Sequence, residues 1–173
     1  APGFQSETVT IVTDDDDEST YTFTITGNGL SAAASQPEIS VKQGGTNIID
    51  ASATPVDYGS VDLAGGSQTL TYTITNVGSA DLTVSGITSD DGDFVVGNIQ
   101  TSAPAAYILG NVISQGDFIT FDVTFDPLTL TGTRSATITI TNNDITDSED
   151  SFTFGVQGVS IGYPEINSTG PIA

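Results

Sequence analysis

The chain repeats itself, because residues 1–30 and residues 134–163 follow the same pattern. Each copy has an apolar segment rich in threonine, an acidic loop, a second apolar segment ending in glycine, and then Pro-Glu-Ile. The matching segments are residues 8–13 and 136–141, residues 21–27 and 152–158, and residues 37–39 and 164–166. A repeat of this kind decides the architecture. We therefore expect one whole repeat, preceded by the end of another and followed by the start of a third.

Alternation of polar and apolar residues predicts β-strands along most of the chain. The clearest case is residues 68–76, where Leu70, Tyr72 and Ile74 alternate with threonines. We find no apolar spacing typical of a helix, and β-branched residues favour strands. The expected strands are residues 8–13, 21–27, 38–42, 46–49, 58–63, 68–76, 81–87, 94–96, 117–126, 134–141 and 151–157, with residues 97–112 irregular.

This spacing of strands and turns predicts an all-β fold, an immunoglobulin-like antiparallel β-sandwich with an extra N-terminal hairpin and a C-terminal extension. The sandwich is expected in residues 37–160, and the hairpin, a partial repeat, in residues 1–30. Residues 31–36 are expected to be a linker, and residues 161–173 the start of a further repeat or a C-terminal extension.

The chain is strongly acidic. Its net charge is −20, and Lys42 and Arg134 are its only basic residues. Such a surface repels nucleic acid and anionic lipid, so we expect neither nucleic-acid binding nor direct membrane insertion. The acidity has two interpretations, solubility through self-repulsion or binding of divalent cations.

A series of short motifs runs in a fixed order through residues 37–158. The motifs are Pro37-Glu38-Ile39, Asp-Tyr-Gly-Ser-Val at 57–61, Thr-Tyr-Thr-Ile-Thr-Asn-Val-Gly-Ser-Ala-Asp-Leu at 71–82, Phe-Asp-Val-Thr-Phe-Asp-Pro at 121–127, Gly-Thr-Arg-Ser-Ala-Thr-Ile-Thr-Ile at 132–140, Asn142-Asn143-Asp144 and a closing Phe154-Xaa-Xaa-Xaa-Gly158. This order resembles the immunoglobulin-like repeats of bacterial choice-of-anchor D surface proteins, which are related to Hydin-type domains. Residues 7–29 resemble part of the same repeat. The resemblance implies a secreted or cell-surface bacterial protein with a structural or adhesive role, and it brings no catalytic residues.

The residues themselves also argue against an enzyme. The chain has no His and no Cys, so neither a serine–histidine nor a cysteine–histidine arrangement can be built. The acidic residues lie mostly in turns or at outward positions of strands, which is a poor arrangement for paired carboxylate catalysis. We expect a non-enzymatic protein that requires no cofactor.

The acidic loops could bind calcium, which prefers six to eight oxygen ligands. The alternative is that these loops are solvated turns, since Asp, Asn and Gly are common turn residues. A third loop, residues 142–150, has the same two interpretations. The candidate ligands are Asp14, Asp15, Asp16 and Asp17 in the first loop, and Asp90, Asp91 and Asp93 in the second.

The N-terminal hairpin is the feature that bears most directly on function. A two-stranded hairpin is marginal in water, and this one is expected to have one apolar face. In a tandem array that face would complete a preceding repeat, and in a free subunit it would dock on the sandwich or on the next molecule. The expected interface residues are Val9, Ile11, Tyr21, Phe23 and Ile25 in the hairpin, with Ile166 and Ile172 in the trailing segment.

These expectations lead to one function and one alternative. The first is a structural subunit of an extracellular bacterial filament, in which copies of the chain join head to tail through their terminal strands. The alternative is a module of a tandem-repeat cell-surface adhesin that binds glycan or protein, in which calcium in the acidic loops would stiffen the array.

Overall fold

The computed structural model describes residues 3–29, 34–63, 65–103 and 105–162. The chain forms two compact units, Ala1–Ala34 and Ser35–Ala173. The division lies inside residues 31–36, the stretch expected to be a linker. Ser35 belongs to the second unit because its hydroxyl donates to the carbonyl of Ser79 at 2.7 Å.

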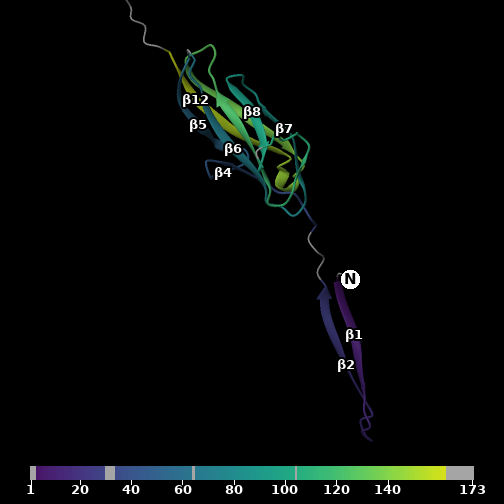
Figure 1. Cartoon of the computed structure of the whole chain (residues 1–173). Helices are drawn as coiled ribbons and strands as arrows, with labels where there is room; N and C mark the ends of the chain where they lie inside the picture. The colour runs from purple at the N-terminus through teal and green to yellow at the C-terminus, as the bar shows by residue number, and fades with distance from the viewer. Residues whose placement is uncertain (1–2, 30–33, 64, 104, 163–173) are drawn as a thin grey trace, which may run out of the picture. The chain divides into compact units, whose positions relative to one another are not determined.

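The first unit is the hairpin that the repeat predicts. Strands β1 (Gly3–Val12) and β2 (Thr20–Gly29) pair in antiparallel fashion along their whole length (Figure 1). Thr13 closes the acidic loop, since its amide donates to the carbonyl of Ser19 at 3.1 Å and its hydroxyl to that of Glu18 at 2.9 Å.

The second unit contains two five-stranded sheets, which confirms the immunoglobulin-like β-sandwich (Figure 1). The first sheet, here called the receiving sheet, has the order β4-β3-β6-β10-β8, and the second has the order β5-β12-β11-β7-β9. The receiving sheet consists of β3 (Ile39–Gln43), β4 (Thr46–Ile48), β6 (Gln68–Asn76), β8 (Phe94–Thr101) and β10 (Phe118–Phe125). The second sheet consists of β5 (Ser52–Asp62), β7 (Leu82–Ser89), β9 (Val112–Ile113), β11 (Gly132–Asn142) and β12 (Ser151–Ile161), and a single 3-10 turn, η1 (Thr146–Ser148), lies between β11 and β12.

Several strands differ from the sequence expectation: β1 begins earlier than residue 8, β12 continues past residue 157, and the short strand β9 begins in the stretch expected to be irregular. The differences in β8 and β5 have identifiable causes. Strand β8 continues to Thr101, into the stretch expected to be irregular, and β5 begins at Ser52 and pairs in parallel with β12. The alternation of polar and apolar residues is interrupted in β8. Its pairing register with β10 shifts between Thr120 and Asp122, and Asn98 has a positive φ of 50°. In β5 the alternation is interrupted by Pro55 and by Gly59, whose φ is 71°.

Aromatic rings from both sheets fill the space between them. The ring of Tyr72 lies 5.2 Å from that of Phe121 and 5.1 Å from that of Phe154, measured between centroids. The hydroxyls of Tyr58 and Tyr72 are 3.0 Å apart, so each buried phenol has a hydrogen-bond partner. Burial raises the pKa of Tyr72 to about 12. The ring of Phe125 stacks on that of Phe94 with centroids 4.7 Å apart.

Candidate assembly interface

The five apolar residues expected in the hairpin lie on one face of it, here called the hairpin face. The register places Val9 opposite Phe23 and Ile11 opposite Tyr21, and period-2 alternation puts Ile25 on the same side. Ile11, Tyr21, Phe23 and Ile25 are 41–56% exposed. Their role as an interface stays a prediction. Ile166 and Ile172 lie outside the described residues.

The hairpin face has a buried counterpart in the sandwich. The corresponding pairs of the two hairpins are Ile11–Tyr21 and Ile140–Phe152, Val9–Phe23 and Ile138–Phe154, Glu7–Ile25 and Ala136–Val156, and Gln5–Gly27 and Arg134–Gly158. In β11–β12 the five apolar counterparts of the hairpin face are at most 2% exposed. The hairpin β1–β2 therefore has the pattern of a hairpin that closes a sandwich, while its own apolar face remains exposed.

Gly158 and Gly27 occupy corresponding positions in the two hairpins, and sequence reasoning did not predict their different surroundings. A Cβ atom added to Gly158 would lie 2.4 Å from a ring carbon of Phe125, so this glycine makes room for the ring. A Cβ atom at Gly27 would meet nothing within 4 Å. The sequence did contain a signal for this packing position, because a glycine ends the second apolar segment in both repeat copies.

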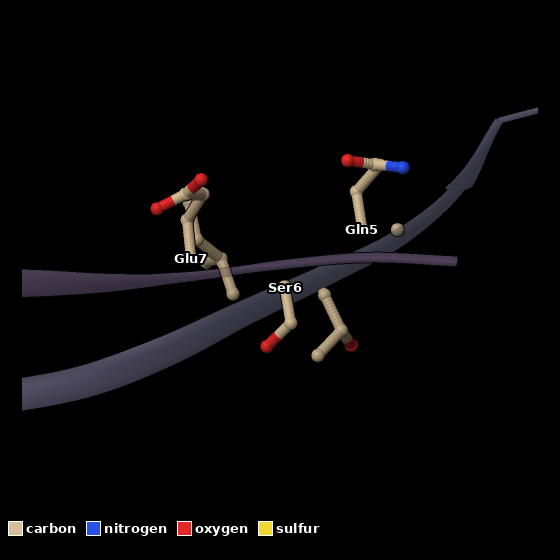
Figure 2. A pocket seen from close by; sticks show the side chains of 6 residues that line it. Gln5, Ser6 and Glu7 are labelled. Atoms are coloured by element: carbon tan, nitrogen blue, oxygen red, sulfur yellow. The ribbon is translucent and has the colours of Figure 1, made fainter. Parts of the chain in front are cut away.

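A shallow pocket lies at Gly27. It is lined by Gln5, Ser6, Glu7, Ile25, Thr26 and Gly27. Figure 2 shows Gln5 and Glu7 projecting to one side of the ribbon and Ser6 to the other, as strand alternation requires. Gln5, Glu7 and Ile25 thus surround Gly27 on the side of the hairpin face.

The first predicted calcium loop consists of residues Asp14–Asp17, and all four of their side chains are exposed. The amide of Asp17 donates to Oδ1 of Asp15 at 3.4 Å, which is a local turn contact. Within the described part of the chain, the carboxylates of Asp14, Asp15, Asp16 and Asp17 are not among those that converge in groups of three. Calcium binding at this loop stays a prediction.

The second predicted calcium loop is held by protein donors. Arg134 Nε donates to Oδ2 of Asp93 at 2.5 Å, and Nη2 lies 3.5 Å from Oδ2 of Asp91. The amide of Leu128 donates to the other oxygen of Asp93 at 3.2 Å, and the amide of Thr137 donates to Asp90 at 2.7 Å. The cationic partner of Asp91 and Asp93 in the structure is therefore an arginine, and calcium binding here also stays a prediction.

A different carboxylate cluster does form, from residues far apart in the sequence. Oxygens of Glu38, Asp144 and Glu149 lie within 4.8 Å of one another. Asp144 is buried and accepts hydrogen bonds from the amides of Ile39 and Thr146, each at 2.9 Å. The sequence pointed to the loop of Asp144 and Glu149 but not to Glu38, because only the packing of the chain before β3 against this loop brings Glu38 near.

Comparison with known proteins identifies this fold. Residues 47–158 match the family model described as the HYDIN/CFA65/VesB-like immunoglobulin-like domain. The chain belongs to this family. The match confirms the resemblance to Hydin-type repeats and the immunoglobulin-like class of the sandwich. No curated protein matches the sequence.

A solved structure shows the same fold at low sequence identity. A protein of unknown function from Porphyromonas gingivalis W83 has a TM-score of 0.50 and 15% identity, over 92% of this chain and 66% of that one. The ASH/PapD-like domain 7 of human CEP192 has a TM-score of 0.49 and 11% identity, over 78% of this chain and 92% of that domain. This chain thus spans just under two thirds of the Porphyromonas protein's length.

The HYDIN/CFA65/VesB-like domain places this chain among structural or adhesion-type modules. Domains of this family are in general non-enzymatic. Among the described residues, no helix has the length and apolarity needed to cross a bilayer.

The carboxylate cluster predicts a pH dependence of stability. Burial, and then the charges of Glu38 and Asp144, raise the pKa of Glu149. A carboxyl group with a raised pKa in the folded state binds its proton more tightly there than in the unfolded chain. Its stabilising effect is complete below the ordinary pKa of glutamate and is lost as the pH rises through the raised pKa.

We therefore expect Glu149→Gln to raise the free energy of unfolding at pH 7 by about 0.5 kcal/mol. The gain should vanish near pH 3.5, where the carboxyl group of Glu149 is protonated in both the folded and the unfolded chain. Urea unfolding at the two pH values measures it. Asp62→Asn, an exposed substitution outside the cluster, is the control and should show no such difference. An equal gain at both pH values would contradict the electrostatic explanation.

Proposed function

We propose that this chain is a structural subunit of an extracellular bacterial filament, built from immunoglobulin-like units joined head to tail through their terminal strands. In this arrangement the β1–β2 hairpin closes the sandwich of a neighbouring unit, and residues 37–160 form the unit of the subunit itself. The segment 161–173 would lead into the next unit. Copies of the chain are the proposed partners.

The observation that carries this proposal is the exposed hairpin face. Its side chains correspond in register to five buried residues of β11–β12, yet four of them are 41–56% exposed. Burying a large apolar side chain contributes roughly 1.5–3 kcal/mol, so covering this face would drive association of units. A contact between unlike surfaces gives an open filament when its rotation does not close into a ring, and the proposed contact does not close.

The charge of the chain supports the extracellular part of the proposal. A net charge of −20 keeps a long assembly soluble and repels nucleic acid. The proposed role is to link one unit mechanically to the next, which is non-enzymatic and needs no cofactor.

The test is deletion of the hairpin. A chain without residues 1–30 should form no filaments, whereas the sandwich should unfold at an unchanged temperature because it is a separate compact unit. Electron microscopy measures filament formation and circular dichroism measures unfolding.

A matched pair of variants tests the same point in the whole chain. Val9→Asp with Phe23→Asp places two charges on the hairpin face and should abolish filaments. Thr10→Asp with Thr22→Asp places them at the neighbouring cross-strand pair on the opposite face and should leave filaments intact. Filaments that persist without the hairpin would overturn the proposal and favour the adhesin alternative.

A further inference from the structure

We propose that the pocket at Gly27 receives an aromatic side chain from the inner face of an immunoglobulin-like sheet, in the way that Gly158 receives Phe125. This inference rests on the proposed function and deepens it, because it names the partner surface. The partner is a sheet of the same kind as the receiving sheet, with an aromatic residue at the position of Phe125.

The first argument is the packing at Gly158. The ring of Phe125 lies so close to this glycine that a Cβ atom would come within 2.4–2.5 Å of two ring carbons. Glycine weakens a strand and often marks a close approach of another group. Gly27 is in the corresponding position of β2, opposite Gln5 as Gly158 is opposite Arg134, but among the described residues no atom lies within 4 Å of a Cβ added there. The close approach that would explain a glycine here has to come from a partner.

The second argument is that the apolar side chains themselves correspond. Ile11 and Phe23 are identical to their counterparts Ile140 and Phe154. The other three pairs differ only slightly in size or by one hydroxyl; they are Val9 and Ile138, Tyr21 and Phe152, and Ile25 and Val156. Since the ring of Phe154 packs against Tyr72 of the receiving sheet at 5.1 Å, Phe23 is suited to a sheet with an aromatic residue at that position too.

The third argument concerns which sheet is free to accept the hairpin. In its described residues, each chain has two hairpins of this pattern but one receiving sheet, and its own β11–β12 covers that sheet. In a filament of identical copies, the partner sheet must therefore belong to a copy whose own β11–β12 hairpin is displaced. This requirement excludes simple docking of the hairpin on an intact sandwich as the way the pocket is filled.

The experiment pairs two forms of the full chain. The acceptor carries Ile138→Asp and Phe154→Asp, which prevent its own β11–β12 from covering the receiving sheet, and Val9→Asp and Phe23→Asp, which disable its own hairpin face. The donor is the wild-type chain, used below the concentration at which it forms filaments. Calorimetric titration and light scattering measure the complex, and circular dichroism measures folding of the acceptor when the donor is added.

We expect a 1:1 complex. Gly27→Val in the donor should weaken it at least 100-fold, whereas Thr24→Val, on the opposite face of β2, should leave it unchanged. Phe125→Ala in the acceptor should remove most of the difference between the Gly27→Val donor and the wild-type donor, because the colliding ring is gone. Equal binding by the Gly27→Val and wild-type donors, or no complex at all, would overturn the inference.

A second variant keeps the test decisive if the acceptor does not stay soluble. The full chain with Ile138→Val, Phe152→Tyr and Val156→Ile carries the apolar residues of the hairpin face in β11–β12. It should still fold, with a melting temperature within about 10 °C of the wild type. Loss of the folded sandwich would show that these side chains do not fit such a sheet. If Val9→Asp with Phe23→Asp abolishes filaments but Gly27→Val does not, the pocket inference fails and the proposed function stands.

Discussion

Replacing Gly158 by alanine is expected to destabilise the sandwich by about 3 kcal/mol, at the upper end of the range for overpacking a core. The reason is steric, because the new methyl group would lie 2.4 Å from a carbon of the Phe125 ring. That ring is fully buried and stacks on Phe94 at 4.7 Å, so it has little room to move. Urea unfolding followed by circular dichroism measures the loss.

The chain contains its own control for this substitution. Gly27→Ala makes the same change at the corresponding position of β2, where nothing lies within 4 Å, and should leave the unfolding of the sandwich unchanged. Gly158→Ala combined with Phe125→Leu should be less harmful than the sum of the single changes, since the smaller side chain relieves the collision. A Gly158→Ala chain as stable as the wild type would show that the ring can move aside.

Arg134→Met is expected to cost about 3 kcal/mol, because it leaves a buried carboxylate without its cation. The side chain of Asp93 is 7% exposed and that of Arg134 is 25% exposed, so water can replace the guanidinium only in part. A loss of this size should lower the melting temperature by roughly 10 °C. Thermal unfolding measures it directly.

Replacing one or the other of the two carboxylates that Arg134 contacts, those of Asp91 and Asp93, should not destabilise the sandwich equally. Asp91→Asn removes the weaker contact at 3.5 Å and should cost less than about 1 kcal/mol. Asp93→Asn combined with Arg134→Met should be less destabilising than the two single changes together, since no uncompensated charge remains. Additive effects would mean that Arg134 acts mainly through packing of its aliphatic stem.

The carboxylates show most clearly how far sequence reasoning reached. Composition and loop patterns identified the acidic turns, including Asp90, Asp91 and Asp93, but gave no means of pairing them with the single arginine. Arg134 and Asp93 are 41 residues apart, and their contact depends on how the turn before β8 lies beside β11. The same is true of Glu38 and Glu149, which only the packing of the chain before β3 against the loop after β11 brings together.

The sequence by itself determined the repeat, the strands of the hairpin and sandwich, and the apolar face made by Val9, Ile11, Tyr21, Phe23 and Ile25. It could do so because strand alternation is a local property: successive side chains point to opposite faces whatever the rest of the chain does. The tertiary structure decided the rest, namely the parallel pairing of β5 with β12, the ion pair at Asp93 and the ring that lies on Gly158. These depend on contacts between residues distant in the chain, and neither alternation nor composition specifies which distant residues meet.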